Sequence, residues 1–281
     1  KANEALLRVR DLEPGDAMVK AELALRSGNT KDAAFNREKM RDEDYLPKPE
    51  EFLARARKNP AKKGEIFDRQ LHWVRIVTYH PDKRISQLMH YAREVVIEPR
   101  TDNDLYEPSI PSEGGDTELL FAKLYRKDGT IAQPEEQSSG GRPYVRWPEL
   151  HTGDIVEVAV RSWTDGPVGR RGDAPFYFID YVGSTDTHPI LYNEVVVDSA
   201  EGSRLAIDVL NGKVERYDEQ KKDGRVIQRY IWENPPIVPE EPLAPRLSEI
   251  LPVVVGSTFA GWDEFREWYR SAVQGFTEPD E

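Results

Sequence analysis

The chain has 281 residues, and 51 Asp and Glu residues against 39 Lys and Arg residues give it a formal net charge of −12 at pH 7. This balance argues against a general nucleic-acid or anionic-membrane binder, because affinity for phosphate depends on Lys and Arg. No apolar run approaches the roughly 20 residues of a membrane-spanning helix, and the absence of cysteine excludes disulfides, thiolate metal sites and cysteine nucleophiles from this chain.

Residues 1–45 are predicted to form a helical lead-in. Apolar residues recur at helical spacing, and turns at Pro14-Gly15-Asp16 and Gly28-Asn29 divide them into short helices. The run from Leu12 to Ala33 resembles part of a tetratricopeptide repeat, of which about three copies are needed to bury a continuous core. Two interpretations stay open, the last fragment of an upstream helical array or an ordinary lead-in. The chain does not begin with methionine, so we expect it to be cut from a longer protein.

Residues 46–64 are predicted to be a charged linker. Its composition is rich in Pro and Lys, and a short helix from Glu50 to Arg57 is expected inside it, entered through Pro49.

Residues 65–252 are predicted to form the main domain, because about ten strand-like runs follow one another between turns. Residues 66–79 and 85–97 should pair as a long hairpin, and residues 155–160 are the clearest strand. Asp128-Gly129, Asn211-Gly212 and Asp223-Gly224 are predicted hairpin turns, and residues 133–142 a polar loop. The predicted fold class is mainly β, an antiparallel β-sandwich with a short helical N-terminal segment and a C-terminal helix.

Residues 253–281 are predicted to be a junction followed by a helix. Trp262, Phe265, Trp268 and Tyr269 lie at helical spacing, so the helix has an aromatic face that needs a surface to pack on. We predict that these four residues make an interdomain contact.

The order of these segments resembles the DUF3857 domain, a β domain that precedes a transglutaminase-like core in many bacterial proteins. The matching segments are residues 121–129 (FAKLYRKDG), 150–157 (LHTGDIVE), 230–233 (YIWE), the Pro-rich passage ending at Pro252, and residues 257–269. The resemblance covers about residues 65–269. It implies a catalytic core downstream with a Cys-His-Asp constellation, a protein partner or substrate for that core, and a location in the bacterial periplasm or cell envelope.

The chain itself is therefore expected to be a non-catalytic accessory domain, with no catalytic residue, cofactor or metal of its own. A rival hypothesis is a carbohydrate- or peptide-binding module, which would use the aromatic side chains of residues 147–181, namely Trp147, Trp163, Tyr177 and Tyr181. A complete enzyme of unknown chemistry is the third. His72 and His90 could face each other on the predicted hairpin, with Glu94 or Asp82 beside them, but scattered histidines are more often structural than metal ligands.

Overall fold

The computed structural model describes residues 42–61, 68–80, 85–99, 116–139, 142–164, 177–185, 189–235, 237–238, 245–259 and 261–273. Its first elements are the 3-10 helix η2 (Asp42–Tyr45) and the α-helix α3 (Pro49–Lys58), which begins at Pro49 as predicted. The helices predicted before residue 42 lie outside the described residues.

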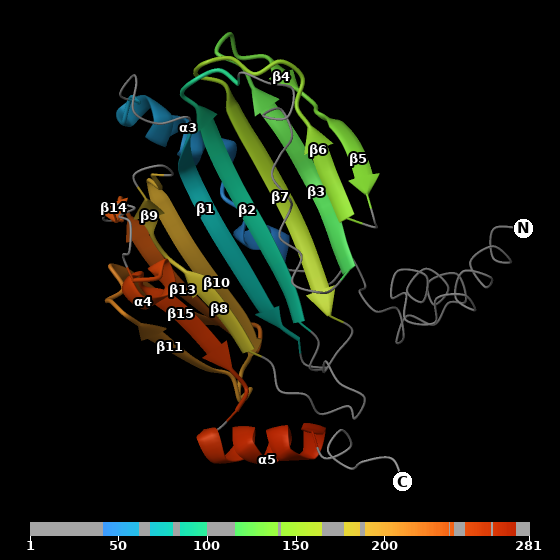
Figure 1. The fold of residues 1–281 in the computed structure, drawn as a ribbon, viewed down its shortest axis with the longest axis vertical. Helices are drawn as coiled ribbons and strands as arrows, with labels where there is room; N and C mark the ends of the chain where they lie inside the picture. Colours follow the sequence, from blue (N-terminus) through green and yellow to red (C-terminus); the bar gives the residue numbers. More distant parts are fainter. Residues whose placement is uncertain are drawn as a thin grey trace, which may run out of the picture.

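The largest feature is a strongly twisted sheet of eight strands, in the order β12-β13-β10-β1-β2-β7-β3-β4 (Figure 1). The predicted hairpin is confirmed, since β1 and β2 pair antiparallel along their whole length. β1 and β10 run parallel, so the sheet is mixed rather than fully antiparallel. The strands are β1 (Asp68–Tyr79), β2 (Ile85–Val95), β3 (Asp116–Tyr125), β4 (Ile131–Ala132), β7 (Ile155–Thr164), β10 (Tyr192–Ala200), β12 (Arg216–Lys222) and β13 (Arg225–Glu233).

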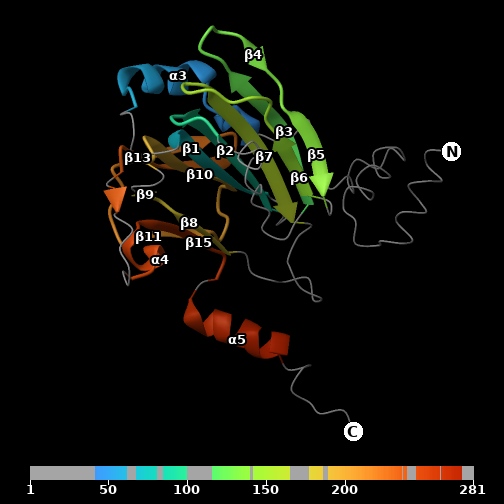
Figure 2. The same ribbon diagram turned by 45° about the horizontal axis from the view of Figure 1, so that its top comes forward.

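A second sheet covers one face of the first and makes the fold a two-layer structure (Figure 2). It contains β11 (Ala206–Leu210), β15 (Val253–Ser257) and β8 (Tyr177–Tyr181), with β15 in the centre. Side chains from both sheets, including Val77, Val195, Phe178 and Val254, form a shared hydrophobic cluster. The prediction of a mainly β fold is confirmed.

Two small sheets complete the architecture. β14 (Ile237–Val238) pairs with β9 (Ser184–Thr185), and β5 (Glu135–Ser139) pairs with β6 (Arg142–Arg146). Residues 133–142 were predicted to be a loop, and that prediction is wrong for β5, which is polar because it pairs in a two-stranded hairpin outside the main sheet. A short helix, α4 (Leu247–Ile250), interrupts the Pro-rich passage.

The domain extends beyond both of its predicted limits. Phe52 of α3 is fully buried and packs with Leu71, Ala92 and Ile155, so the segment predicted to be a linker contributes to the core. At the other end, β15 lies beyond Pro252 and is the central strand of the second sheet.

Two of the three predicted hairpin turns are confirmed and the third is wrong. Asp128-Gly129 lies in the turn that joins the antiparallel pair β3 and β4. Asp223 and Gly224 both have positive φ and join β12 to β13, as a two-residue type I′ turn requires. Asn211-Gly212 instead joins β11 to β12, which belong to different sheets. The dipeptide supplies a chain reversal, but the identity of the pairing strands is decided by the packing around them.

Candidate functional site

The first candidate is the C-terminal helix α5 (Trp262–Val273). Phe265 contacts the rings of Trp262, Trp268 and Tyr269 at centroid separations of 5.6, 5.9 and 6.1 Å. At 3.6 residues per turn these four residues fall within about 120° of the helix circumference. The sequence therefore places an aromatic stripe along one side of α5, as predicted.

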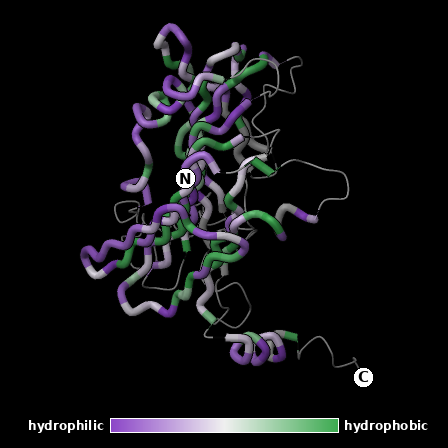
Figure 3. Tube along the Cα trace, turned by 90° about the vertical axis from the view of Figure 1, so that its left-hand side faces the viewer, coloured by the Kyte–Doolittle hydropathy of each residue, from purple (hydrophilic) through white to green (hydrophobic). Residues whose placement is uncertain are grey.

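This stripe is open to solvent at two of its four residues, while Phe265 and Trp268 are half-buried. Trp262 is 79% exposed and Tyr269 54% exposed. α5 stands apart from the two sheets in all three views (Figures 1, 2 and 3), and no described helix or strand makes an extensive contact with it. Phe259 packs edge-on against both Phe265 and Trp268, and an ion pair of 3.7 Å joins Glu264 to Arg204.

The second candidate is the aromatic surface predicted within residues 147–181, and the structure does not support it as a whole. Trp147 is fully buried in a cluster with Val145 and Val158, so it cannot contact a ligand at the surface. Tyr181 is 46% exposed on β8, beside Ile179. The side chains of Trp163 and Tyr177 lie outside the described part of the structure.

The third candidate is a row of buried polar side chains on the face of the large sheet that α3 covers. Arg55 Nη1 lies 3.0 Å from His72 Nδ1, and the His72 ring packs edge-on against His90 at a centroid separation of 5.2 Å. His90 Nε2 lies 3.0 Å from Glu157 Oε1, and the Tyr125 hydroxyl donates to Glu157 Oε2 at 2.6 Å. One continuous row thus crosses from α3 through β1, β2 and β7 to β3.

Burial and hydrogen bonding together determine the protonation states of His72 and Glu157 in this row. Burial lowers the pKa of His72 well below its usual value, and the charges of His90 and Arg55 lower it further. Burial alone would raise the pKa of Glu157, but hydrogen bonds from His90 and Tyr125 outweigh it and hold that pKa below its ordinary value. At neutral pH the row therefore combines a neutral His72 with an ionised Glu157.

A second branch of the row runs toward β13. The Arg55 guanidinium lies over the Tyr192 ring at 3.9 Å, and Tyr192 donates to Glu194 at 2.8 Å. Glu194 also accepts a hydrogen bond of 2.5 Å from Arg229. Arg55 is therefore the point where both branches meet α3.

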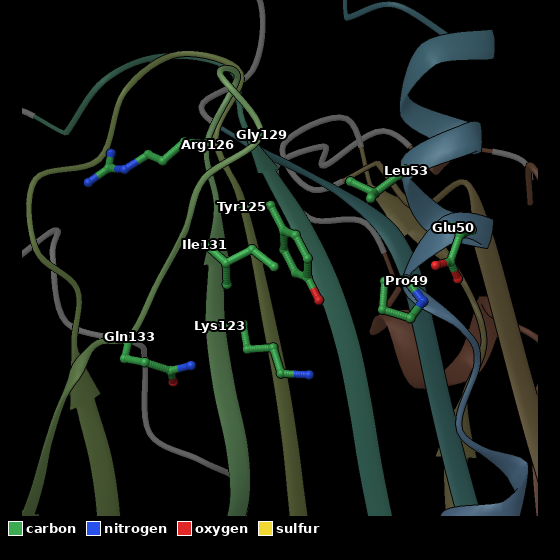
Figure 4. Close-up of a pocket in the computed structure, with 9 residues that line it drawn as sticks. All are labelled: Pro49, Glu50, Leu53, Lys123, Tyr125, Arg126, Gly129, Ile131 and Gln133. Carbon is green, nitrogen blue, oxygen red and sulfur yellow. The ribbon is translucent and has the colours of Figure 1, made fainter.

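A pocket of about 580 Å³ opens where the first branch ends (Figure 4). Figure 4 shows the Tyr125 ring projecting from β3 between Ile131 and the residues of α3. The lining combines apolar and charged side chains from α3 and from the β3–β4 region: Pro49, Glu50, Leu53, Lys123, Tyr125, Arg126, Gly129, Ile131 and Gln133. Such a volume is within the range of small-molecule sites, but the lining presents no pair of groups arranged for a defined reaction.

The two histidines of the predicted hairpin do face each other, whereas the carboxylates considered beside them lie elsewhere. Glu94 pairs with Arg69 at 2.5 Å, and Asp82 lies outside the described residues. Among the described residues no group of three or more potential ligands gathers around a common point. An arginine donating to His72 also opposes a cation at this place.

The functional features that sequence reasoning missed are Arg55, Glu157 and Tyr125. Their hydrogen bonds join residues 17 to 67 positions apart in the chain, so no local spacing connects them. The only signal was the presence of polar residues at alternate positions of strands that are otherwise apolar, as at His72 and His90.

Comparisons with known proteins give a likeness of fold. No family model matches the sequence, and no curated protein does. Among solved structures, the "putative protease" of Parabacteroides distasonis aligns over 69% of this chain and 41% of its own, with 16% identity and a TM-score of 0.54. An M1 zinc metallopeptidase from Deinococcus radiodurans aligns over 69% and 43%, with 10% identity and a TM-score of 0.37.

The aligned part of this chain thus spans about two fifths of the length of these solved proteins. At 16% identity the first likeness identifies a shared fold.

Within the described residues, the helices are too short or too polar to span a membrane.

Proposed function

We propose that this chain is a non-catalytic accessory domain, and that the aromatic stripe of α5 docks onto a catalytic domain of the same protein. The observation that carries the proposal is the exposure of Trp262 and Tyr269 on a helix that stands apart from both sheets. Helices shorter than about 12–15 residues are marginally stable alone in water. α5 has 12 residues, so a packing surface for its stripe would add stability that its own sequence lacks.

The expected partner is a transglutaminase-like core, as the resemblance to DUF3857 implies. The fold likeness to a protein described as a protease supports a catalytic neighbour, because the aligned part is 41% of that longer chain. Cysteine is absent here, so the nucleophile of such a core would belong to another part of the protein. A periplasmic or envelope location is proposed on the family resemblance alone.

The test compares this chain with the complete product of its gene. Hydrogen exchange of α5 amides should be slow in the complete protein and fast in the isolated chain. Trp262→Ser should remove the added protection, because a central aromatic side chain at an interface contributes about 2 kcal/mol or more, roughly thirtyfold in affinity. Glu267→Ala is the matched control, since Glu267 lies on the opposite side of α5.

Two results would contradict the proposal. One is a reading frame with no further domain. The other is exchange in α5 that is equally fast in the isolated chain and the complete protein.

A binding module remains the second candidate, favoured by Tyr181 and Ile179, which are 46% and 41% exposed on the same strand. Exposed aromatic and aliphatic side chains of this kind suit a sugar ring or an apolar peptide side chain. A glycan and peptide array probed with the wild-type chain and with Tyr181→Ala tests it. Binding that the substitution leaves unchanged would exclude this surface.

A further inference from the structure

Two buried nitrogens in the polar row have no hydrogen-bond partner among the described residues, namely His72 Nε2 and His90 Nδ1. Both rings are almost fully buried, with exposures of 1% and 0%. They belong to the two imidazoles that contact each other edge-on at 5.2 Å. A buried polar atom without a partner costs about 1–3 kcal/mol, so the pair is sensitive to which atoms carry protons.

The neighbours of the pair determine where those protons are. Arg55 has only donors, so His72 Nδ1 must accept, and the single proton of that ring lies on Nε2. Glu157 is an acceptor, so a proton of His90 lies on Nε2 and faces that carboxylate. The hydrogen bond from Arg55 therefore exists only while His72 Nδ1 carries no proton.

We propose that His72 is a pH-sensitive latch, which holds α3 on the sheet while its neutral ring accepts the hydrogen bond from Arg55 and loosens α3 when the ring takes up a second proton. A second proton on His72 converts Nδ1 into a donor that faces the guanidinium of Arg55. Two donors then face each other with no acceptor between them, and movement of Arg55, and of α3 with it, relieves the contact.

The surrounding charges leave Arg55 as the group that yields. The His90 ring lies edge-on to His72 and pairs with Glu157, whereas His72 has no carboxylate within hydrogen-bonding distance among the described residues and stacks on the Tyr192 ring at 5.1 Å. The other charged or titratable groups of this face pair among themselves. They are Arg69 with Glu94, Arg161 with Asp42, Glu43 and Glu118, Lys123 and Tyr125 with Glu157, Glu194 with Tyr192 and Arg229, and Asp198 with Tyr45 and Arg225.

Whether the contact of α3 with the sheet becomes stronger or weaker with pH depends on the number of protons bound with α3 in place and with α3 displaced. With α3 in place His72 resists protonation, and with α3 displaced it returns toward its ordinary pKa near 6.5. The displaced state therefore binds more protons, and the latch weakens as pH falls below about 6.5. Glu157 has a lowered pKa, so its stabilising contribution is lost only at lower pH, below about 4.3.

Hydrogen exchange of the amides of α3 tests the latch in the wild-type chain at pH 7.5 and pH 5.5, after correction for the intrinsic pH dependence of exchange. At pH 5.5, one unit below the ordinary pKa of histidine, the uptake of one proton by His72 in the displaced state should lower the protection factors of the α3 amides by up to about tenfold. The amides of β10 and β13 should keep their protection. In His72→Gln, which retains an acceptor for Arg55 but does not titrate in this range, the loss should be threefold or less.

His151→Gln is the matched control, because the His151 side chain is 49% exposed and its ion pairs are with Glu98 and Glu149 rather than with α3; it should respond as the wild type does. The latch is refuted if α3 is protected equally at both pH values, if His72→Gln loses as much protection as the wild type, or if sheet and helix lose it together. Should His72→Gln fail to fold, imidazole NMR of the wild type decides. A His72 ring that becomes doubly protonated at pH 5.5 while α3 stays protected also refutes the latch.

Discussion

Replacing Asp42 by Ala should destabilise the domain strongly, although Asp42 lies in a segment that precedes all of the strands. Both oxygens of Asp42 accept hydrogen bonds of 2.9 Å from Arg161, and the two side chains are 1% and 2% exposed. Removing one partner of a buried ion pair leaves the other charge uncompensated, at a cost of about 3–5 kcal/mol. Glu43 at 2.5 Å and Glu118 at 3.6 Å remain near Arg161, so we expect the lower end, about 3 kcal/mol.

Urea denaturation at pH 7, followed by tryptophan fluorescence, measures this loss as a shift of the midpoint at constant slope. Glu201→Ala is the matched control, because Glu201 pairs with Lys221 at 3.2 Å in an exposed position, where such pairs contribute about 0–1 kcal/mol. If Asp42→Ala lowers the free energy of unfolding no more than Glu201→Ala does, then η2 does not bury Arg161, and the residues before α3 are not part of the folded domain.

Two other substitutions test the packing and the polar row. A Cβ on Gly256 would clash with the ring of Phe178, so Gly256→Ala should lower the free energy of unfolding by about 1–3 kcal/mol through overpacking. In the control Gly202→Ala the added Cβ meets nothing within 4 Å, so the cost should be only the strain of the positive φ. Equal losses of stability in urea denaturation of the two variants would contradict the contact with Phe178. Tyr125→Phe removes a donor from the buried Glu157 and should cost about 1–3 kcal/mol at pH 7. Because that donor helps to lower the pKa of Glu157, the difference in free energy of unfolding between Tyr125→Phe and the wild type should become smaller below about pH 4.3. If this difference is constant from pH 7 to pH 3, Glu157 is not ionised in the folded protein.

The sequence was sufficient to predict the strands of the large sheet, because their alternation is a local property, whereas β5 and β15 fell in segments predicted to be a loop and a junction. The hairpin of β1 and β2, the strand β7 and the turn at Asp223-Gly224 all follow from spacing and turn chemistry. Pairing between distant strands was not predictable. The parallel contact of β1 with β10 joins residues 120 positions apart, and nothing in either strand specifies the other.

The site residues divide in the same way. The stripe of α5 was visible as helical periodicity, and its exposure was the part that needed the structure. Trp147 was considered as a surface residue because aromatic side chains suit both a core and a binding face. Its burial depends on packing against β2, β3 and β7, which local sequence does not reveal.

The connection between β15 and α5 bears on how a docked domain would be held. Only four residues separate the end of β15 at Ser257 from the start of α5, and the amide of Phe259 donates to Ser257 Oγ at 3.1 Å. β15 itself is hydrogen-bonded on both sides, by β11 and β8. A partner bound to the aromatic stripe would therefore be attached, through a short connection, to the central strand of the second sheet. Lengthening the connection between β15 and α5 by several Gly and Ser residues should leave the fold unchanged and weaken only the positioning of the docked domain relative to the second sheet. This behaviour is expected of an accessory domain whose role is to orient its neighbour.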